Sequence, residues 1–204
     1  QGDRRFPEIA THFVEALRDR WSWRVLAKNF PGLIVGHKYD YVIDLSDDSA
    51  PSRVVRLVGE RKRILEVGAG PGSMTRVLRD QFGCHVTAIE IDEESIQSLT
   101  PYAERVYRVD LNDASWPDKI DREAKFDVVI AADVLEHLYD PWTALQRMSG
   151  LIAPGGCLIA SVPHAGHNAI IASLLNEHVE YRESGLLDET HIRFFGMTDI
   201  QSLF

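Results

Sequence analysis

The sequence predicts a doubly wound α/β fold, a mostly parallel sheet with helices on both faces. Two observations predict it: short, continuously apolar runs, typical of strands covered on both faces, and amphipathic helices that alternate with these runs. A third is a glycine-rich turn directly after the first apolar run. In such a sheet, ligands bind beyond the carboxyl ends of the strands, so the residues at those ends are the candidate site.

An amphipathic helix is expected ahead of the sheet. Apolar residues recur every four positions from residue 7 to residue 30, and a proline opens this pattern. Residues 39–44 are expected to form a short strand or an ordered loop, and Pro51 opens a second helix that ends before Gly59. Residues 1–60 are therefore interpreted as an N-terminal helical extension, and residues 61–204 as the main domain.

Within the main domain, five strands and three helices are expected to alternate. The strands are predicted at residues 64–67, 85–89, 106–109, 126–132 and 157–162. The helices are predicted at residues 73–82, 93–103 and 142–151. A further helix starts near Thr198 and runs into the end of the chain, which favours a domain that is truncated at its C-terminus.

The composition limits the classes of protein to which this chain can belong. The chain has 204 residues, of which 45% are hydrophobic, enough for a full core without metals or disulfides. Its 22 basic and 31 acidic residues give a net charge of −9, which argues against nucleic acid and anionic membranes as partners. Cys84 and Cys157 lack the spacing of a zinc site. Without a long apolar run, no membrane insertion is expected, and the chain is interpreted as cytoplasmic.

The turn after the first strand has glycines at three alternate positions, Gly68, Gly70 and Gly72. Glycine lets the backbone turn tightly and approach a ligand closely. A dinucleotide-binding fingerprint would need a glycine at position 73, which is a serine, and a Walker loop would need a lysine that is absent. The loop is therefore predicted to hold a ligand, but not through phosphates.

Carboxylates follow the next two strands. Glu90 lies 20 residues after Gly70, a separation that suits the two hydroxyls of a ribose, because a carboxylate can accept both protons. Asp110, beside the backbone N–H of Leu111, could read the amino edge of an adenine. Together these residues predict a site for adenosine without phosphates.

The chain at this point resembles the class I S-adenosylmethionine-dependent methyltransferases, which have a Rossmann-like fold. The resemblance covers residues 64–162 and rests on E-V-G-A-G-P-G at 66–72, on Glu90, on Asp110-Leu111, on A-A-D-V-L-E-H-L at 131–138 and on A-P-G-G at 153–156. It implies S-adenosyl-L-methionine as the cofactor. The residues that it places around the cofactor are Glu66, Gly68, Ala69, Gly70 and Gly72 at the methionine end, Glu90 at the ribose, Ile91, Asp110 and Leu111 at the adenine, and Ala132 near the sulfonium.

Residues 161–195 are similar to methyltransferases of polysaccharide pathways, and D-V-L-E-H-L is shared with ubiquinone-biosynthesis O-methyltransferases. This resemblance implies an enzyme that methylates a hydroxyl of a small molecule or a saccharide. An N- or protein methyltransferase, and a non-catalytic cofactor-binding module in a biosynthetic complex, remain alternatives. A homodimer also remains open.

A hydroxyl acceptor needs a base near the transferred methyl group. His137 and His191 are the expected catalytic residues, ahead of Asp133, Glu136 and His164. Each histidine also has a structural interpretation, His137 as a brace for the following helix and His191 as an anchor for its loop. No metal is assigned, although the likeness to the ubiquinone enzymes leaves open a divalent cation on Asp133, Glu136 and His137. The pair Tyr39 and Tyr41 is interpreted as anchoring a loop.

Overall fold

The computed structural model describes residues 39–121 and 125–204, so the helix predicted at residues 7–30 lies outside the described residues. The core is a five-stranded sheet in the order β3-β2-β1-β4-β5, and every pair of neighbouring strands is parallel. The strands are β1 (Arg63–Val67), β2 (His85–Glu90), β3 (Arg105–Arg108), β4 (Phe126–Ala132) and β5 (Ile152–Ser161). The doubly wound fold predicted from the sequence is confirmed.

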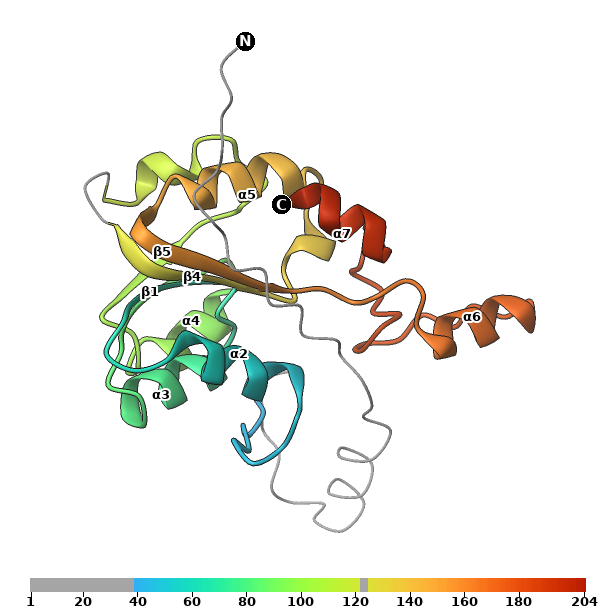
Figure 1. The fold of residues 1–204 in the computed structure, drawn as a ribbon, viewed down its shortest axis with the longest axis horizontal. Helices are drawn as coiled ribbons and strands as arrows, with labels where there is room; N and C mark the ends of the chain where they lie inside the picture. Colours follow the sequence, from blue (N-terminus) through green and yellow to red (C-terminus); the bar gives the residue numbers. More distant parts are fainter. Residues whose placement is uncertain (1–38, 122–124) are drawn as a thin grey trace.

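Helices cover both faces of this sheet (Figure 1). On one face lie α2 (Ala50–Val58), α3 (Ser73–Asp80) and α4 (Glu93–Leu99), and on the other α5 (Pro141–Ser149) and α7 (Met197–Leu203). Short 3₁₀ helices occur at η1 (Trp116–Lys119) and η2 (Leu135–His137), and α6 (Asn168–Leu175) follows β5. The inner strands β1 and β4 are covered on both faces, so their side chains are mostly apolar on both sides, whereas the edge strand β3 exposes Arg105 and Arg108.

Each face has its own hydrophobic core. Val54, Val55 and Val58 of α2 pack with Ile64 and Ile130 of the sheet on one side. The other side is built around the following buried residues: Leu65, Val67, Val129, Leu145, Met148 and Phe195. Neighbouring residues of one strand, such as Ile64 and Leu65, therefore enter opposite cores, as the alternation of a pleated strand requires.

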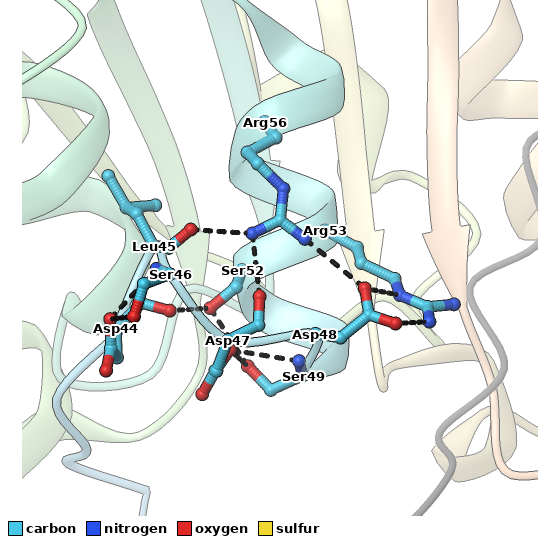
Figure 2. Close-up of polar contacts among 9 residues, drawn as sticks. All are labelled: Asp44, Leu45, Ser46, Asp47, Asp48, Ser49, Ser52, Arg53 and Arg56. Atoms are coloured by element: carbon cyan, nitrogen blue, oxygen red, sulfur yellow. Dashed lines mark hydrogen bonds and ion pairs between the residues drawn. The ribbon is translucent and has the colours of Figure 1, made fainter.

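The acidic segment before α2 is a hydrogen-bonded cap (Figure 2). Asp44 Oδ1 accepts from Ser46, Asp47 Oδ1 accepts from Ser49, and the buried Ser52 hydroxyl donates to the backbone oxygen of Asp44 at 2.7 Å. Arg53 pairs with Asp48 at the exposed edge. The three aspartates are exposed, yet their hydrogen bonds order the entry to the helix.

Residues 39–44 form a loop, one of the two forms expected, and contain no strand. Other elements differ from the sequence expectations. The last strand starts at Ile152 rather than at Cys157, because a register shift opposite Phe126–Val128 lets it continue through Gly155 and Gly156. The structure also adds α6, which projects from the body of the protein and leaves Leu174 and Leu175 60% and 79% exposed (Figure 1). None of the helices among the described residues has both the length and the hydropathy needed to cross a bilayer.

Gly68 forms the contact between the glycine loop and the segment after β4. Its φ of +66° lies in the left-handed region, and a Cβ there would approach Val134 Cγ2 to 2.6 Å. The loop can therefore lie against Val134 only with a glycine at this position.

We expect Gly68→Ala to destabilise the protein by roughly 2–3 kcal/mol, because the substitution adds a clash to backbone strain. Gly155→Ala is the matched control, since Gly155 has a φ of +80° but no atom within 4 Å of the added Cβ. Urea unfolding of both variants measures the difference. Equal losses of stability would show that the contact with Val134 is unimportant.

Candidate functional site

The glycine loop is held against the end of β2 by backbone hydrogen bonds. The N–H groups of Gly68 and Ala69 donate to the backbone oxygen of Ile89 at 2.8 and 3.1 Å. The Gly70 N–H donates to Glu90 Oε2 at 2.7 Å. The loop after β1 and the carboxylate after β2 are therefore joined directly. This contact is possible because β1 and β2 are parallel neighbours, so their carboxyl ends lie at the same edge of the sheet.

Glu90 organises this edge. Its other oxygen, Oε1, accepts from the N–H groups of Ile91 and Asp92 at 2.7 and 2.9 Å, and the residue is only 8% exposed. One carboxylate thus accepts three backbone hydrogen bonds from two loops. A carboxylate offers about four acceptor positions, so a position is left for a ligand hydroxyl. The ribose contact remains a prediction, whereas ordering of the glycine loop is a role that the sequence did not reveal.

The three glycines of the loop serve different purposes. Among the described residues, a Cβ on Gly70 would meet only Tyr39 Cβ, at 3.7 Å. A Cβ on Gly72 would lie 3.0 Å from Leu99 Cδ1, so Gly72 allows α3 to pack against α4. The position of Gly70 thus suits an approach to a ligand, whereas Gly68 and Gly72 allow close packing, against Val134 and Leu99 respectively.

Glu66 is a buried carboxyl group with one free oxygen. Thr75 Oγ1 donates to Glu66 Oε2 at 2.6 Å, but Glu66 Oε1 has no hydrogen-bond partner among the described residues. Burial raises the pKa of Glu66 to about 7, and the nearby charge of Glu90 adds to this effect. The free oxygen fits the ammonium group of a ligand, because a donor there would satisfy an atom that is costly to leave unpaired.

The segment before α2 lies over the glycine loop. The Tyr41 N–H donates to Ser73 Oγ at 3.1 Å, and Asp40 pairs with Arg76 at 3.3 Å. Loss of hydration and the negative charges of Asp133 and Glu66 raise the pKa of Tyr41. Tyr41 is thus an anchored loop residue, as expected, and the charges of two carboxylates of the site act on its phenol. This electrostatic effect could not be predicted, because residues 39–44 show no hydrophobic periodicity.

The residues expected around an adenine lie at the same edge of the sheet. Ile91 is 53% exposed, and Leu111 is half-buried. Asp110 is exposed, and its Oδ1 accepts from the N–H of Asn112 at 2.9 Å, which forms a local turn. The structure brings these side chains to the ends of β2 and β3 as predicted, and their contact with a base remains a prediction.

Asp133 follows Ala132 at the end of β4 and adopts a left-handed conformation, with a φ of +53°. Its N–H donates to the backbone oxygen of Ser161 at 3.0 Å, and the Ser161 hydroxyl donates to Asp133 Oδ1 at 2.9 Å. These bonds to β5 hold a backbone conformation that is costly for a residue with a side chain. The turn directs the chain from the sheet into η2.

Three side chains converge next to this turn: Glu136 and His137 from η2, and His191 from the loop before α7. His191 Nε2 lies 3.8 Å from Glu136 Oε1, and the two imidazole rings meet edge to face with centroids 4.8 Å apart. The backbone oxygen of Glu136 accepts from the N–H groups of Ile192 and Arg193, both at 3.0 Å. The loop therefore packs against η2 and brings the two expected catalytic histidines together.

The Glu136 side chain is the most buried polar group of this cluster. It is 0% exposed, and neither carboxylate oxygen has a hydrogen-bond partner among the described residues. Burial, followed by the charge of Asp133, raises the pKa of Glu136 to about 9. Burial, followed by repulsion from His137, lowers the pKa of His191. The dry environment thus favours the neutral forms of both side chains.

One ligand atom from each of Glu136, His137 and His191 lies within 4.8 Å of the other two, so this set could hold a cation. Asp133 is not part of this set, and its Oδ1 accepts a hydrogen bond from the Ser161 hydroxyl. His164, also a candidate base, lies elsewhere, in a bridge with Phe195. The site residues predicted from the sequence thus form two groups, the glycine loop with the carboxylates after β1 to β3, and the cluster after β4.

A five-stranded parallel sheet in this order, with a glycine loop after β1 and carboxylates after the next two strands, defines the Rossmann-like fold of class I methyltransferases. A protein-family model described as "Methyltransferase domain" matches residues 41–204 of this chain. The chain belongs to this family.

Curated relatives agree with the family. A ubiquinone biosynthesis O-methyltransferase from Maricaulis maris is 33% identical over 111 residues, which cover 52% of this chain and 43% of that protein. The O-methyltransferase resE from Aspergillus sclerotiorum is 28% identical over 210 residues, covering 92% of this chain and 78% of that protein. The alignment with the bacterial enzyme thus spans less than half of its length.

Solved structures show the same fold. Magnesium protoporphyrin IX methyltransferase from Synechocystis PCC 6803, solved with bound S-adenosylhomocysteine, superposes with a TM-score of 0.56 at 17% identity, covering 75% of this chain and 68% of that one. A SAM-dependent methyltransferase from Archaeoglobus fulgidus gives a TM-score of 0.57 at 18% identity, covering 75% and 64%. These similarities support the fold alone.

Glu66→Gln should make the protein more stable at neutral and alkaline pH. The pKa of Glu66 is raised in the folded protein, so the unfolded chain ionises first as the pH rises from 4.5, and the folded state loses stability up to about pH 7. The variant, which cannot ionise, avoids this loss. We expect an advantage of up to about 3 kcal/mol at pH 8 and none at pH 4.

Urea unfolding at both pH values measures the effect, with the exposed Glu60→Gln as the matched control. A Glu66→Gln variant whose stability follows that of the parent protein at every pH would show that this carboxyl group is not held in its neutral form.

Proposed function

We propose that this domain transfers the methyl group of S-adenosylmethionine to a hydroxyl group of a small-molecule acceptor. The observation that carries the proposal is the direct contact between the two groups of site residues. Gly68 of the glycine loop lies against Val134, and Val134 precedes the turn that bears Glu136 and His137. A nucleoside on the loop would thus lie beside the histidine cluster.

The donor set suits the cofactor. Glu66, with its free Oε1, would take the ammonium group, and the exposed side of the Gly68–Gly70 backbone leaves room for the methionine end. Glu90 would bind the ribose through its remaining acceptor position, and Ile91, Asp110 and Leu111 would bind the adenine. When bound, the cofactor supplies an electrophilic methyl group on a positively charged sulfur.

The protein's own contribution is alignment and removal of a proton. Methyl transfer is an in-line displacement, so holding the acceptor behind the methyl group can contribute several kcal/mol. A hydroxyl must also lose its proton. The cluster of His137, His191 and Glu136 follows Val134, which contacts the loop, and we assign it the activation of the hydroxyl. Tyr41, close to Glu66 and Asp133, would close the pocket from above.

Several observations support oxygen as the acceptor atom. The relatives from Maricaulis and Aspergillus are named O-methyltransferases. Residues 161–195 resemble methyltransferases of polysaccharide pathways, which favours a saccharide among hydroxyl compounds. Nitrogen remains the alternative, since a glycine/sarcosine/dimethylglycine N-methyltransferase from Actinopolyspora halophila is 27% identical over 115 residues.

Glu90→Gln should weaken binding of S-adenosylhomocysteine by about tenfold to a hundredfold, because an amide cannot accept at both positions now occupied by backbone N–H groups. Isothermal calorimetry measures the affinity. Glu93→Gln, at the exposed start of α4, is the control. Failure of the parent protein to bind the nucleoside at high micromolar concentration would refute the proposed function.

His137→Ala should lower kcat by roughly a hundredfold while leaving the affinity for S-adenosylhomocysteine unchanged. The assay supplies nucleotide sugars and catechols as acceptors and detects S-adenosylhomocysteine by mass spectrometry, with His164→Ala as the control. NMR of the product distinguishes O- from N-methylation. A parent protein that binds the cofactor but turns over none of these acceptors would favour a binding module over an enzyme.

A further inference from the structure

Helix α6 has an exposed apolar face. Ile170 is the only buried residue of its eight, whereas Ile171, Leu174 and Leu175 are exposed. These three side chains are spaced by three and four positions, so they lie on one face of the helix. Helices of fewer than about 12 residues are marginally stable in water, so a two-turn helix depends on packing against another segment. The exposed face of α6 therefore needs a cover.

The apolar surface continues beyond the end of the helix. Glu177 has a φ of +54°, and the His178 N–H donates to the backbone oxygen of Ser173 at 3.1 Å, so the chain turns back after α6. Val179 and Tyr181, in the segment that follows this turn, are also exposed. A run of exposed apolar side chains of this kind is typical of an interaction surface. The following five residues form the α6 patch: Ile171, Leu174, Leu175, Val179 and Tyr181.

Acidic residues accompany the α6 patch. Residues 176–189 contain five acidic residues and one basic residue. The basic residue, Arg182, pairs with Glu180 at 3.2 Å, whereas Glu177, Glu183 and Glu189 are also exposed to solvent. Negative charge beside an apolar surface favours a partner that is both apolar and basic, and it opposes binding to an anionic bilayer.

The sequence ahead of Tyr39 has the complementary chemistry. The helix expected at residues 7–30 has an apolar residue at every fourth position, and these residues are Ile9, Phe13, Leu17, Trp21 and Val25. Residues 1–38 contain seven basic and four acidic residues, whereas the rest of the chain contains 15 basic and 27 acidic residues. The N-terminal segment is therefore both amphipathic and basic, in a chain that is otherwise acidic.

The structure shows where this segment joins the domain. The Tyr41 N–H donates to Ser73 Oγ, and Tyr39 lies beside Gly70, so the chain enters the domain at the carboxyl edge of the sheet. Strand β5 ends at the same edge, and α6 begins seven residues later. Residues 31–38, which separate the expected helix from Tyr39, can span up to about 26–29 Å. The N-terminal segment and α6 are thus attached to one edge of the sheet.

We propose that the helix predicted at residues 7–30 packs its apolar stripe on the α6 patch of the same chain, with its basic residues beside residues 176–189. The size of the patch favours a partner in the same chain. A stable interface between two molecules buries about 800 Å² on each partner, more than a two-turn helix and a short return segment offer. A tethered segment needs less, because its effective concentration is in the millimolar range. The proposal does not depend on the proposed function.

Hydrogen exchange followed by mass spectrometry tests the contact in the full chain, without cofactor. We expect the amides of residues 9–25 and 168–175 to exchange at least about a hundredfold more slowly than in an unfolded chain. Leu175→Asp should raise the exchange rate of residues 9–25 at least about tenfold, because a buried charge is costly. Leu57→Asp is the matched control, since Leu57 is an exposed leucine of another helix, α2. Unprotected amides at residues 9–25 in the parent protein, or protection that Leu175→Asp leaves unchanged, would overturn the proposal.

The reciprocal variant lies in the N-terminal segment. Leu17→Ala removes part of the apolar stripe and should raise the exchange rate of residues 168–175 about tenfold. Thr11→Ala, on the opposite face of the predicted helix, should leave this rate unchanged. Equal effects of the two variants, or no effect of Leu17→Ala, would contradict the proposal. Far-UV circular dichroism confirms folding, and Leu17→Ala decides the question should Leu175→Asp not fold.

The same samples distinguish other occupants of the α6 patch. Light scattering at two protein concentrations detects a dimer, and vesicles of phosphatidylcholine and phosphatidylglycerol supply a lipid surface. Protection of residues 168–175 only in a dimer would replace the proposal by contact with a second copy, and protection only with vesicles would replace it by a lipid surface. Binding of S-adenosylhomocysteine is measured separately, so failure of this proposal and failure of the proposed function are distinguishable.

Discussion

The site depends on one carboxylate that holds two loops together. Glu90 accepts hydrogen bonds from Gly70, Ile91 and Asp92, so the loops after β1 and β2 share a single anchor. Charged acceptors form stronger hydrogen bonds than neutral ones, and this acceptor is almost fully buried. The left-handed glycines make the loop geometrically possible, whereas Glu90 fixes its position against β2. The shape of the crevice is therefore set before any ligand arrives, which lowers the entropic cost of binding.

A second constraint operates at the end of β4. The bonds between Asp133 and Ser161 hold an unfavourable backbone conformation, and this conformation turns the chain into η2. The Glu136 backbone oxygen then receives the loop that bears His191. Each step uses main-chain geometry to place a side chain. A rigid sheet edge with irregular segments attached to it is the usual way in which α/β proteins position reactive groups.

The regular part of the fold was predictable because its cause is local. Residues 126–132 were expected to be a strand and form β4 with the same bounds, since a strand buried on both faces must be continuously apolar. The start of β5 was missed because Pro154, Gly155 and Gly156 have the composition of a turn, and only pairing with β4 holds them in the sheet. The helix α6 was missed because its residues have no polar face.

The candidate site was predictable in part. The rule that ligands bind at the carboxyl ends of parallel strands indicated Glu90 and His137, and the resemblance to the methyltransferase family indicated Glu66. The convergence of His137 and His191 was not readable from spacing, because it depends on how a long irregular loop returns to η2. The lack of hydrogen-bond partners for the oxygens of Glu66 and Glu136 among the described residues could not be predicted either. Whether a side chain has a partner is a property of the folded molecule.

The contact between Gly68 and Val134 has a consequence for how the two halves of the site communicate. The glycine loop and the segment leading into η2 share a wall with no spare room, so a ligand that displaces one of them displaces the other. Thermodynamic linkage then requires reciprocity: whatever factor an acceptor imposes on nucleoside affinity, the nucleoside imposes on acceptor affinity. Under the proposed function, the packing of a residue that has no side chain would therefore couple the binding of the two ligands.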